Sequence, residues 1–172
     1  MVFGATRFSK YLSEAEITAL VDRLASEIRR DYNGKTILLV CVLKGAYAFL
    51  ADLMRELKMD VEIDFVRLSR HQDTVTLLKD ISRDVRGKHV LIVEEIIDSG
   101  RSLRFLYDRI SQSGPASLEI VSLLDKSTKR VVEVPVKYVG RKVDDCFLIG
   151  YGLDLEDRAR NLPEILSMTY PN

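Results

Sequence analysis

The sequence has no excess of charge of either sign and no long run of apolar residues. Its 26 Lys and Arg residues balance its 26 Asp and Glu residues, so the formal net charge is zero. A balanced charge gives no general attraction to nucleic acid or to an anionic membrane, and neither partner is expected. No stretch approaches the roughly 20 consecutive apolar residues of a membrane-spanning helix. We therefore expect a soluble protein.

Cysteine and histidine are also scarce. The two cysteines, Cys41 and Cys146, lie in apolar, strand-like runs, where a cysteine is usually a small buried hydrophobe. Arg7 and Lys10 near the amino terminus are not followed by an apolar stretch of the kind found in secretion signals, so no disulfide is expected. The two histidines have no metal-ligand spacing. These features favour a reduced, cytoplasmic location.

The length and composition fit one compact unit. A chain of 172 residues, 47% hydrophobic and 30% charged, is long enough to bury a full core. No internal repeat or low-complexity linker divides it, and we expect a single domain over residues 1–172.

Strand patterns alternate with helix patterns through most of the chain. Ser13 and Glu16 form a capping-box pattern, and apolar residues follow at helical spacing. The polar residues 69–73 are expected to be a loop that joins two strands as a hairpin. Strands are expected at residues 36–43, 61–68, 74–78, 90–97, 117–124 and 146–152. This order predicts an α/β fold with a mainly parallel sheet and helices on both faces.

Residues 90–103 are the most informative stretch. Four apolar residues are followed by Glu94 and Glu95, and then by Asp98, a Ser-Gly-Arg-Ser turn and a helical pattern from Leu103. Gly100 permits a sharp turn, and the free N–H groups at the start of the next helix suit a phosphate. The carboxylates would repel that phosphate, so they suit ribose hydroxyls or a divalent cation. The pattern indicates a ribose-phosphate site; the alternative is a solvated acidic turn before a capped helix.

The same stretch resembles the signature of the phosphoribosyltransferases that bind 5-phosphoribosyl-1-pyrophosphate (PRPP). In that signature four apolar residues precede Glu-Asp, two apolar residues, Asp-Thr-Gly, any residue and Thr. Here Glu95 replaces the Asp, while Ser99 and Ser102 replace the Thr residues and keep their hydroxyls. Further stretches resemble the hypoxanthine or hypoxanthine-guanine enzymes in the right order, namely residues 43–45, 126, 147–154 and 160–163. The resemblance implies the type I fold, with a small hood formed by the amino-terminal residues and the tail.

The resemblance also assigns roles around PRPP. The residues implied for the ribose and its 5′-phosphate are Glu94, Glu95, Asp98, Ser99, Gly100, Arg101 and Ser102. Lys44, Gly45 and Arg160 are implied for the pyrophosphate, with a cis peptide before Lys44. The alternatives are a solvated lysine at Lys44 and a surface ion pair between Arg160 and Glu156.

The base and the metal have their own implied residues. Phe147 stacks on the purine, Leu148 holds it through backbone groups, and Lys126 donates to the 6-oxo group. An ammonium group only donates, so Lys126 favours a carbonyl over an amino group. Asp154 lies near the purine edge and joins Glu94 and Glu95 around Mg²⁺. Asp98 is the implied general base toward the purine N7 proton, whereas plain core packing is the alternative for Phe147.

One region departs from the family pattern. Family members carry Ser-Tyr and then a longer mobile loop that closes over the reacting groups, whereas this chain has Ser69, Arg70 and a shorter connection. A lid excludes water and completes a site, so its shortening bears on turnover.

The expected function is transfer of the phosphoribosyl group from PRPP to hypoxanthine or guanine, within a homodimer or homotetramer. Two alternatives stay open. One is a non-catalytic or weakly active PRPP- or nucleotide-binding regulator on the same scaffold. The other is a phosphoribosyltransferase for xanthine or another base such as uracil.

Overall fold

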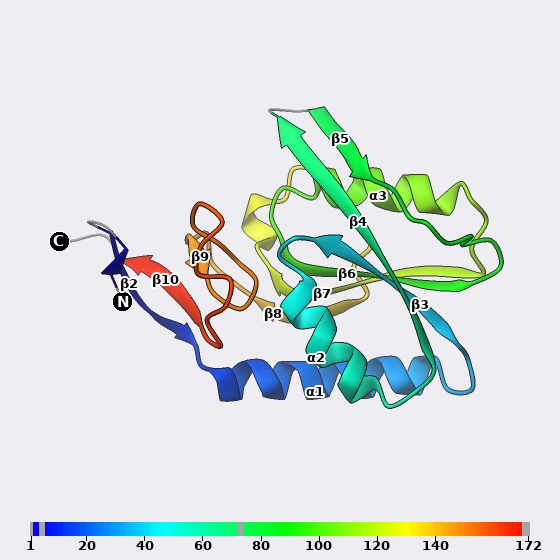
Figure 1. Cartoon of the computed structure of the whole chain (residues 1–172), viewed down its shortest axis with the longest axis horizontal. Coiled ribbons are helices and arrows are strands. Elements are labelled where there is room, and N and C mark those ends of the chain that lie inside the picture. The colour runs from blue at the N-terminus through cyan, green and yellow to red at the C-terminus, as the bar shows by residue number, and fades with distance from the viewer. Residues whose placement is uncertain (1, 4–5, 72–73, 170–172) are drawn as a thin grey trace.

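The computed structural model of the chain describes residues 2–3, 6–71 and 74–169, and its layers are shown in Figure 1. The amino-terminal half contains β1 (Val2–Phe3), β2 (Thr6–Leu12), α1 (Glu14–Asp31), β3 (Ile37–Leu43), α2 (Tyr47–Leu57), β4 (Val61–His71) and β5 (Thr74–Lys79). The carboxyl-terminal half contains β6 (His89–Ile97), α3 (Arg101–Ser111), β7 (Ser117–Asp125), the 3₁₀ turn η1 (Ser127–Lys129), β8 (Tyr138–Lys142), β9 (Leu148–Ile149) and β10 (Ile165–Thr169).

The central sheet has six strands in the order β5-β4-β3-β6-β7-β8. Every neighbouring pair is parallel except β4 and β5, which are antiparallel. The inner strand β3 is buried along almost its whole length, as is the first part of β6. Such continuous apolar runs are typical of parallel strands that are covered on both faces. The predicted α/β fold with a mainly parallel sheet is confirmed.

Helices cover both faces of this sheet. α1 and α2 pack on one face and α3 on the other, each burying an apolar stripe. α1 begins at the predicted capping box, in which Ser13 N donates to the Glu16 carboxylate over 2.9 Å and Glu16 N donates to Ser13 Oγ over 3.3 Å. α3 buries Leu103, Leu106 and Ile110. Burying one leucine contributes about 1.5–3 kcal/mol, so these stripes fix each helix on the sheet.

A second, smaller sheet is formed by the two ends of the chain. Its order is β1-β2-β10-β9, and all its pairs are antiparallel. Figure 1 shows it beside the central sheet, on the side toward which β3 points. The same chain ends were expected to form the small hood.

The strands β4 and β5 form a hairpin that is longer than the sequence predicts. The loop expected at residues 69–73 is wrong for Ser69, Arg70 and His71, which belong to β4 and pair with Thr76, Val75 and Thr74. Polar side chains are tolerated in these strands because this part of the hairpin is exposed. Gln72 and Asp73 lie outside the described residues. The connection between the two strands is therefore short, as predicted.

Both cysteines are free, but only one is in a strand. Cys41 is buried in β3, and burial raises the pKa of its thiol to about 12. Cys146 was expected in a strand too, but it lies half-buried in the irregular segment before β9. No helix of the described chain has the length and apolar character needed to cross a membrane.

Candidate active site

The turn between β6 and α3, together with the first two residues of α3 (residues 98–102), is here called the phosphate corner. Gly100 is the N-cap of α3 and has φ +83°, a left-handed conformation that glycine adopts most easily. A Cβ atom at Gly100 would meet the Val132 carbonyl oxygen at 2.4 Å, so a side chain is also excluded by space. The first N–H groups of α3 have no partner within the helix, and such groups bind phosphate well.

The phosphate corner is held in place from behind by residues 126–132. The N–H groups of Val131 and Val132 both donate to the Ser99 carbonyl, over 3.0 and 3.1 Å. The Lys126 N–H donates to the Ile97 carbonyl over 2.9 Å. These bonds occupy the Ser99 carbonyl of the corner and the Ile97 carbonyl just before it, so the backbone is held in place before any ligand arrives.

A cavity of about 290 Å³ opens in front of the phosphate corner. It is lined by predicted site residues, by Arg70 and by apolar side chains: Val42, Leu68, Arg70, Glu94, Glu95, Ile96, Ile97, Asp98, Ser99, Gly100, Ser102 and Leu103. Asp98 is exposed at its rim. The structure therefore brings six of the seven predicted ribose-phosphate residues into one cavity, while Arg101 begins α3 without lining it.

Glu94 and Glu95 are neighbouring carboxyl groups whose ionised forms are disfavoured by their surroundings. Burial raises the pKa of both carboxyls, and the charge of Glu95 raises that of Glu94 further. The Glu95 N–H donates to Glu94 Oε1 over 3.1 Å, whereas Glu95 Oε2 is buried without a hydrogen-bond partner. A buried acceptor that lacks a donor is costly, and a ligand hydroxyl or a cation would remove the cost.

The same pair decides how well the site fits Mg²⁺. Within the described part of the chain, no three His, Cys, Asp or Glu side chains converge on one point. Mg²⁺ usually takes one or two protein carboxylates and fills its other positions with water and substrate oxygens. Glu94 and Glu95 fit that requirement. Asp154 fits less well, because Arg160 Nη2 lies 2.9 Å from its Oδ1 and the Asp157 N–H donates to its Oδ2 over 2.8 Å.

The pyrophosphate residues lie where β3 meets the tail. The peptide between Leu43 and Lys44 is cis, as the resemblance implied. A Cβ at Gly45 would meet Glu95 Oε1 at 1.8 Å, so the longer acid at position 95 reaches into the space that this glycine leaves. A Cβ at Gly152 would meet the Gly45 carbonyl oxygen at 2.0 Å, which places the tail directly against this loop.

Lys44, Asp157 and Arg160 form an ionic group that is here called the tail clasp. Asp157 Oδ2 lies 2.7 Å from Lys44 Nζ, and its Oδ1 lies 2.8 Å from Arg160 Nη2. Arg160 Nη1 also donates to the Gly152 carbonyl over 2.7 Å. The alternative ion pair between Arg160 and Glu156 is wrong, since its carboxylate partners are Asp154 and Asp157.

Among the predicted purine residues, Lys126 lies beside the start of the corner, where its N–H donates to the Ile97 carbonyl. Lys126 follows β7, with its side chain 13% exposed and its Nζ 3.9 Å from Asp145 Oδ1. Leu148 is buried in β9. Phe147 is 42% exposed, which argues against plain core packing. An exposed aromatic ring is a suitable surface for a planar base.

The comparisons with known proteins agree with this geometry. A family model described as the phosphoribosyl transferase domain matches residues 9–156. The hypoxanthine phosphoribosyltransferase of Escherichia coli is 42% identical over 162 residues, which cover 90% of this chain and 91% of that protein. The hypoxanthine-guanine phosphoribosyltransferase of Streptococcus pneumoniae is 37% identical over 160 residues, which cover 90% of this chain and 89% of that protein. The chain belongs to the hypoxanthine-guanine phosphoribosyltransferase family.

Solved structures of the family support the same conclusion. A crystal structure of a hypoxanthine-guanine phosphoribosyltransferase from Bacillus anthracis matches with a TM-score of 0.91 and 42% identity, covering 94% of this chain and 97% of that one. The family consists of enzymes, and the resemblance noted in the sequence is confirmed at the level of family, fold and enzyme class.

Asp157 is a residue of the site that the sequence did not indicate. It lies in a loop where Glu156, Asp157 and Ala159 all have positive φ, at 52°, 61° and 67°. Left-handed backbone costs roughly 1 kcal/mol or more for a residue other than glycine. The Arg160 guanidinium and the Lys44 ammonium hold the pKa of Asp157 down to about 2. A run of acids near a predicted pyrophosphate site was the available signal.

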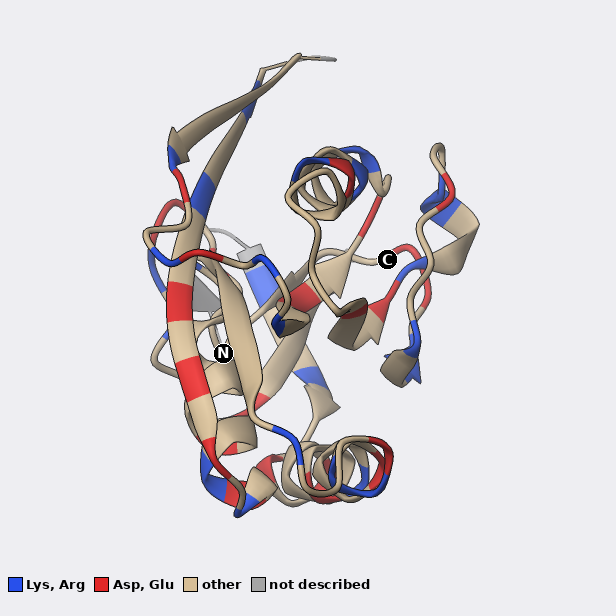
Figure 2. Cartoon of the chain, turned by 90° about the vertical axis from the view of Figure 1, so that its right-hand side faces the viewer, with Lys and Arg blue, Asp and Glu red and all other residues tan. Residues whose placement is uncertain are grey.

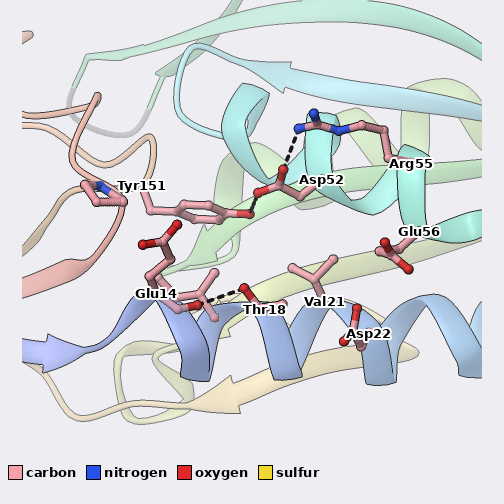
Figure 3. A pocket seen from close by; sticks show the side chains of 10 residues that line it. Glu14, Thr18, Val21, Asp22, Asp52, Arg55, Glu56 and Tyr151 are labelled. Atoms are coloured by element: carbon pink, nitrogen blue, oxygen red, sulfur yellow. Dashed lines mark hydrogen bonds and ion pairs between the residues drawn. The ribbon is translucent and has the colours of Figure 1, made fainter.

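The sequence shows Tyr151 only as part of a family motif and indicates no role for its hydroxyl. A cavity of about 470 Å³ is lined by residues of α1 and α2, and Figure 3 shows Tyr151 pointing toward Asp52 beside it. The Tyr151 hydroxyl donates to Asp52 Oδ2 over 2.5 Å. Burial and the Asp52 charge raise the pKa of Tyr151. This bond ties the tail, and with it the tail clasp, to α2.

Proposed function

We propose that the chain transfers the phosphoribosyl group from PRPP to N9 of hypoxanthine or guanine, giving IMP or GMP and pyrophosphate. The observation that carries the proposal is the phosphate corner beside the partly buried acids Glu94 and Glu95 of β6, since together they pair an anion site with a hydroxyl site. The names of the Escherichia coli and Streptococcus pneumoniae relatives support the same substrate class.

PRPP would bind across the corner and the tail clasp. The amides that open α3, with the hydroxyls of Ser99 and Ser102, receive the 5′-phosphate. Glu94 and Glu95 accept hydrogen bonds from the ribose hydroxyls. Lys44 and Arg160 receive the pyrophosphate, which exchanges with the Asp157 carboxylate that both cations hold in the free protein.

The leaving charge is the main electrostatic task of the site. As the bond between C1′ and the pyrophosphate oxygen breaks, negative charge grows on the pyrophosphate, and Lys44 and Arg160 are positioned to stabilise it. Mg²⁺ bound by Glu94 and Glu95 would add Lewis-acid stabilisation of the same charge. We propose Mg²⁺ as the cofactor on the chemistry of these carboxylates.

The base side supplies orientation and a proton acceptor. Lys126 donates to the 6-oxo group, Phe147 covers one face of the ring, and Leu148 and Asp154 contact its edge. Asp98 accepts the N7 proton as N9 bonds to C1′, because it lines the cavity and stays accessible at its rim. From the family we also propose a homodimer or homotetramer and a cytoplasmic location.

A second candidate function is a PRPP- or nucleotide-binding regulator with little or no turnover. Three observations favour it: the short β4–β5 connection, the reach of Glu95 toward Gly45, and the occupation of Lys44 and Arg160 by Asp157. Transfer to xanthine or another base is a variant of the first proposal.

One assay separates these functions. The protein is incubated with PRPP, Mg²⁺ and either hypoxanthine, guanine, xanthine or uracil, and pyrophosphate release is followed. Release with hypoxanthine or guanine supports the proposal. Binding of PRPP by calorimetry without release supports the regulator, and release only with xanthine or uracil replaces the proposed base.

A further inference from the structure

Arg70 reaches the phosphate corner from a strand that is not next to it in the sheet. β4 and β6 are separated by β3, whose last residue, Leu43, pairs with Arg67. Residues 68–71 continue β4 beyond that point and are paired on one side with β5. From this overhang Arg70 Nη1 donates to Ser99 Oγ over 2.7 Å. Figure 1 shows the hairpin extending past the end of β3.

The charges around the cavity give this contact a chemical meaning. The carboxylates of Glu94, Glu95 and Asp98 line the cavity. Among the Lys and Arg side chains that the structure describes, Arg70 is the one that lines it too. Figure 2 shows β4 changing from acidic positions to basic ones along its length, and the basic end is the one at the cavity. A phosphate dianion near three acids needs a cation, and a guanidinium binds phosphate with good geometry.

The donor pattern leaves both partners ready for an anion. A guanidinium carries five N–H donors, and Ser99 Oγ accepts a bond from one of its nitrogens. Because Ser99 Oγ accepts from Arg70, its own hydroxyl hydrogen is directed at another acceptor. A phosphate oxygen that takes this hydrogen lies beside the guanidinium as well.

We propose that Arg70 is a binding residue for the 5′-phosphate of the substrate, acting together with Ser99 and the amides of α3. The inference rests on the proposed function and deepens it, since it assigns a cation to the phosphate subsite. The β4–β5 hairpin then contributes a fixed charged contact to the site through a strand.

Direct binding tests the proposal without requiring turnover. Ribose 5-phosphate, unphosphorylated ribose and pyrophosphate are titrated by calorimetry into the wild-type protein and into Arg70→Met, Arg70→Lys and Arg86→Met. Arg86→Met removes the same charge from an exposed arginine in the turn before β6, at the opposite end of that strand from the corner. Thermal unfolding of each variant checks that the fold is kept.

We expect Arg70→Met to weaken ribose 5-phosphate binding by about tenfold or more, as for loss of a charged hydrogen bond. Arg70→Lys should keep part of the affinity, because an ammonium keeps the charge but loses the planar fork. Pyrophosphate binding should be unchanged in all variants, and Arg86→Met should match the wild type.

The outcomes distinguish a failure of the role given to Arg70 from a failure of the proposed function. Unchanged ribose 5-phosphate binding in a folded Arg70→Met variant overturns the role of Arg70 and leaves the proposed function intact. Equal losses for pyrophosphate and ribose 5-phosphate also overturn it, since the effect is then not specific to the corner. If the wild type binds neither ribose 5-phosphate nor PRPP with Mg²⁺, the proposed function fails first and the inference fails with it.

Discussion

The phosphate corner and the tail clasp are the proposed sites for the two ends of PRPP, and they differ in how far their groups are already bonded. In the corner the backbone is already bonded from behind, and in the adjoining strand β6 Glu95 Oε2 is buried without a partner. In the tail clasp the cations are already bonded to Asp157. The corner can therefore take a ligand with little rearrangement, whereas the clasp must exchange one anion for another. If the proposed sites are right, sugar phosphate should bind to a preformed site, whereas pyrophosphate should bind more weakly because it must displace Asp157.

The largest effect is expected from removing the proposed base in the corner. Asp98→Asn keeps the shape of the side chain but cannot accept the N7 proton as a carboxylate does. We expect turnover to fall by at least about 10²-fold with a modest change in PRPP affinity. Steady-state kinetics with PRPP and hypoxanthine measure both quantities. Asp108→Asn, on the exposed side of α3, is the control, and near-normal turnover in Asp98→Asn would remove the base assignment.

The rigid shape of the corner is tested by comparing two glycines. Gly100 and Gly114 have φ of +83° and +72°, but only at Gly100 does an added Cβ meet backbone, whereas the space at Gly114 is open. Each alanine should cost roughly 1 kcal/mol of backbone strain, and Gly100→Ala must also displace the corner. We expect the KM for PRPP to rise about tenfold or more in Gly100→Ala alone. Equal kinetics in the two variants would contradict a preformed corner.

The ionised Glu95 carboxylate beside the corner should lower the stability of the fold. The pKa of Glu95 is raised, so its ionised form is disfavoured by folding above that pKa, and protonation relieves the cost as pH falls. Glu95→Gln should therefore raise the free energy of unfolding by on the order of 1 kcal/mol near pH 8, with a smaller gain toward pH 4.

Denaturant unfolding of wild type and Glu95→Gln across this pH range makes the measurement. Glu119→Gln makes the same substitution on the neighbouring strand β7, away from the Glu94–Glu95 pair, and is the control. A stabilisation by Glu95→Gln that grows toward low pH would contradict this prediction, because protonation of Glu95 already removes the cost there.

Removing the hydrogen bond between Tyr151 and Asp52 should have a moderate effect on stability. Tyr151→Phe removes the hydroxyl that donates to Asp52 but keeps the ring, and it should lower the free energy of unfolding by about 1 kcal/mol. The phosphate corner does not depend on this bond, so ribose 5-phosphate affinity should stay at its wild-type value. Calorimetry and denaturant unfolding of the same preparation check the two statements. A loss of ribose 5-phosphate binding would show that the corner and the tail are not independent.

The smallest effect is expected from releasing the tail clasp. Asp157→Asn removes the charge that competes for Lys44 and Arg160, so pyrophosphate should bind about threefold more tightly while ribose 5-phosphate is unaffected. The folded pKa of Asp157 is about 2, below its ordinary value, so the clasp is intact from neutral pH down to the ordinary range of Asp and is lost as pH falls further. Glu156→Gln, at the preceding residue, is the matched control. Weaker pyrophosphate binding in Asp157→Asn would reverse the assigned role.

The two regions also differ in how far the sequence could predict them. The phosphate corner lies within residues 90–103, so local rules for strand ends, turns and helix starts were enough to place it. The tail clasp joins Lys44 to Asp157, which are 113 residues apart, and nothing local to either residue indicates the contact. Arg70 was placed in a loop because its neighbours are polar, whereas the pairing with β5 makes it part of a strand. Long-range pairing is the information that a single sequence did not contain.

The most direct test of the central claim is a crystal structure of the protein with a purine ribonucleoside 5′-monophosphate. The phosphate is expected within hydrogen-bonding distance of the Ser99–Ser102 backbone and of Arg70, with the ribose hydroxyls facing Glu94 and Glu95. A nucleotide bound elsewhere, or a phosphate held by Lys44 and Arg160 with the phosphate corner facing solvent, would contradict the assignment of the corner.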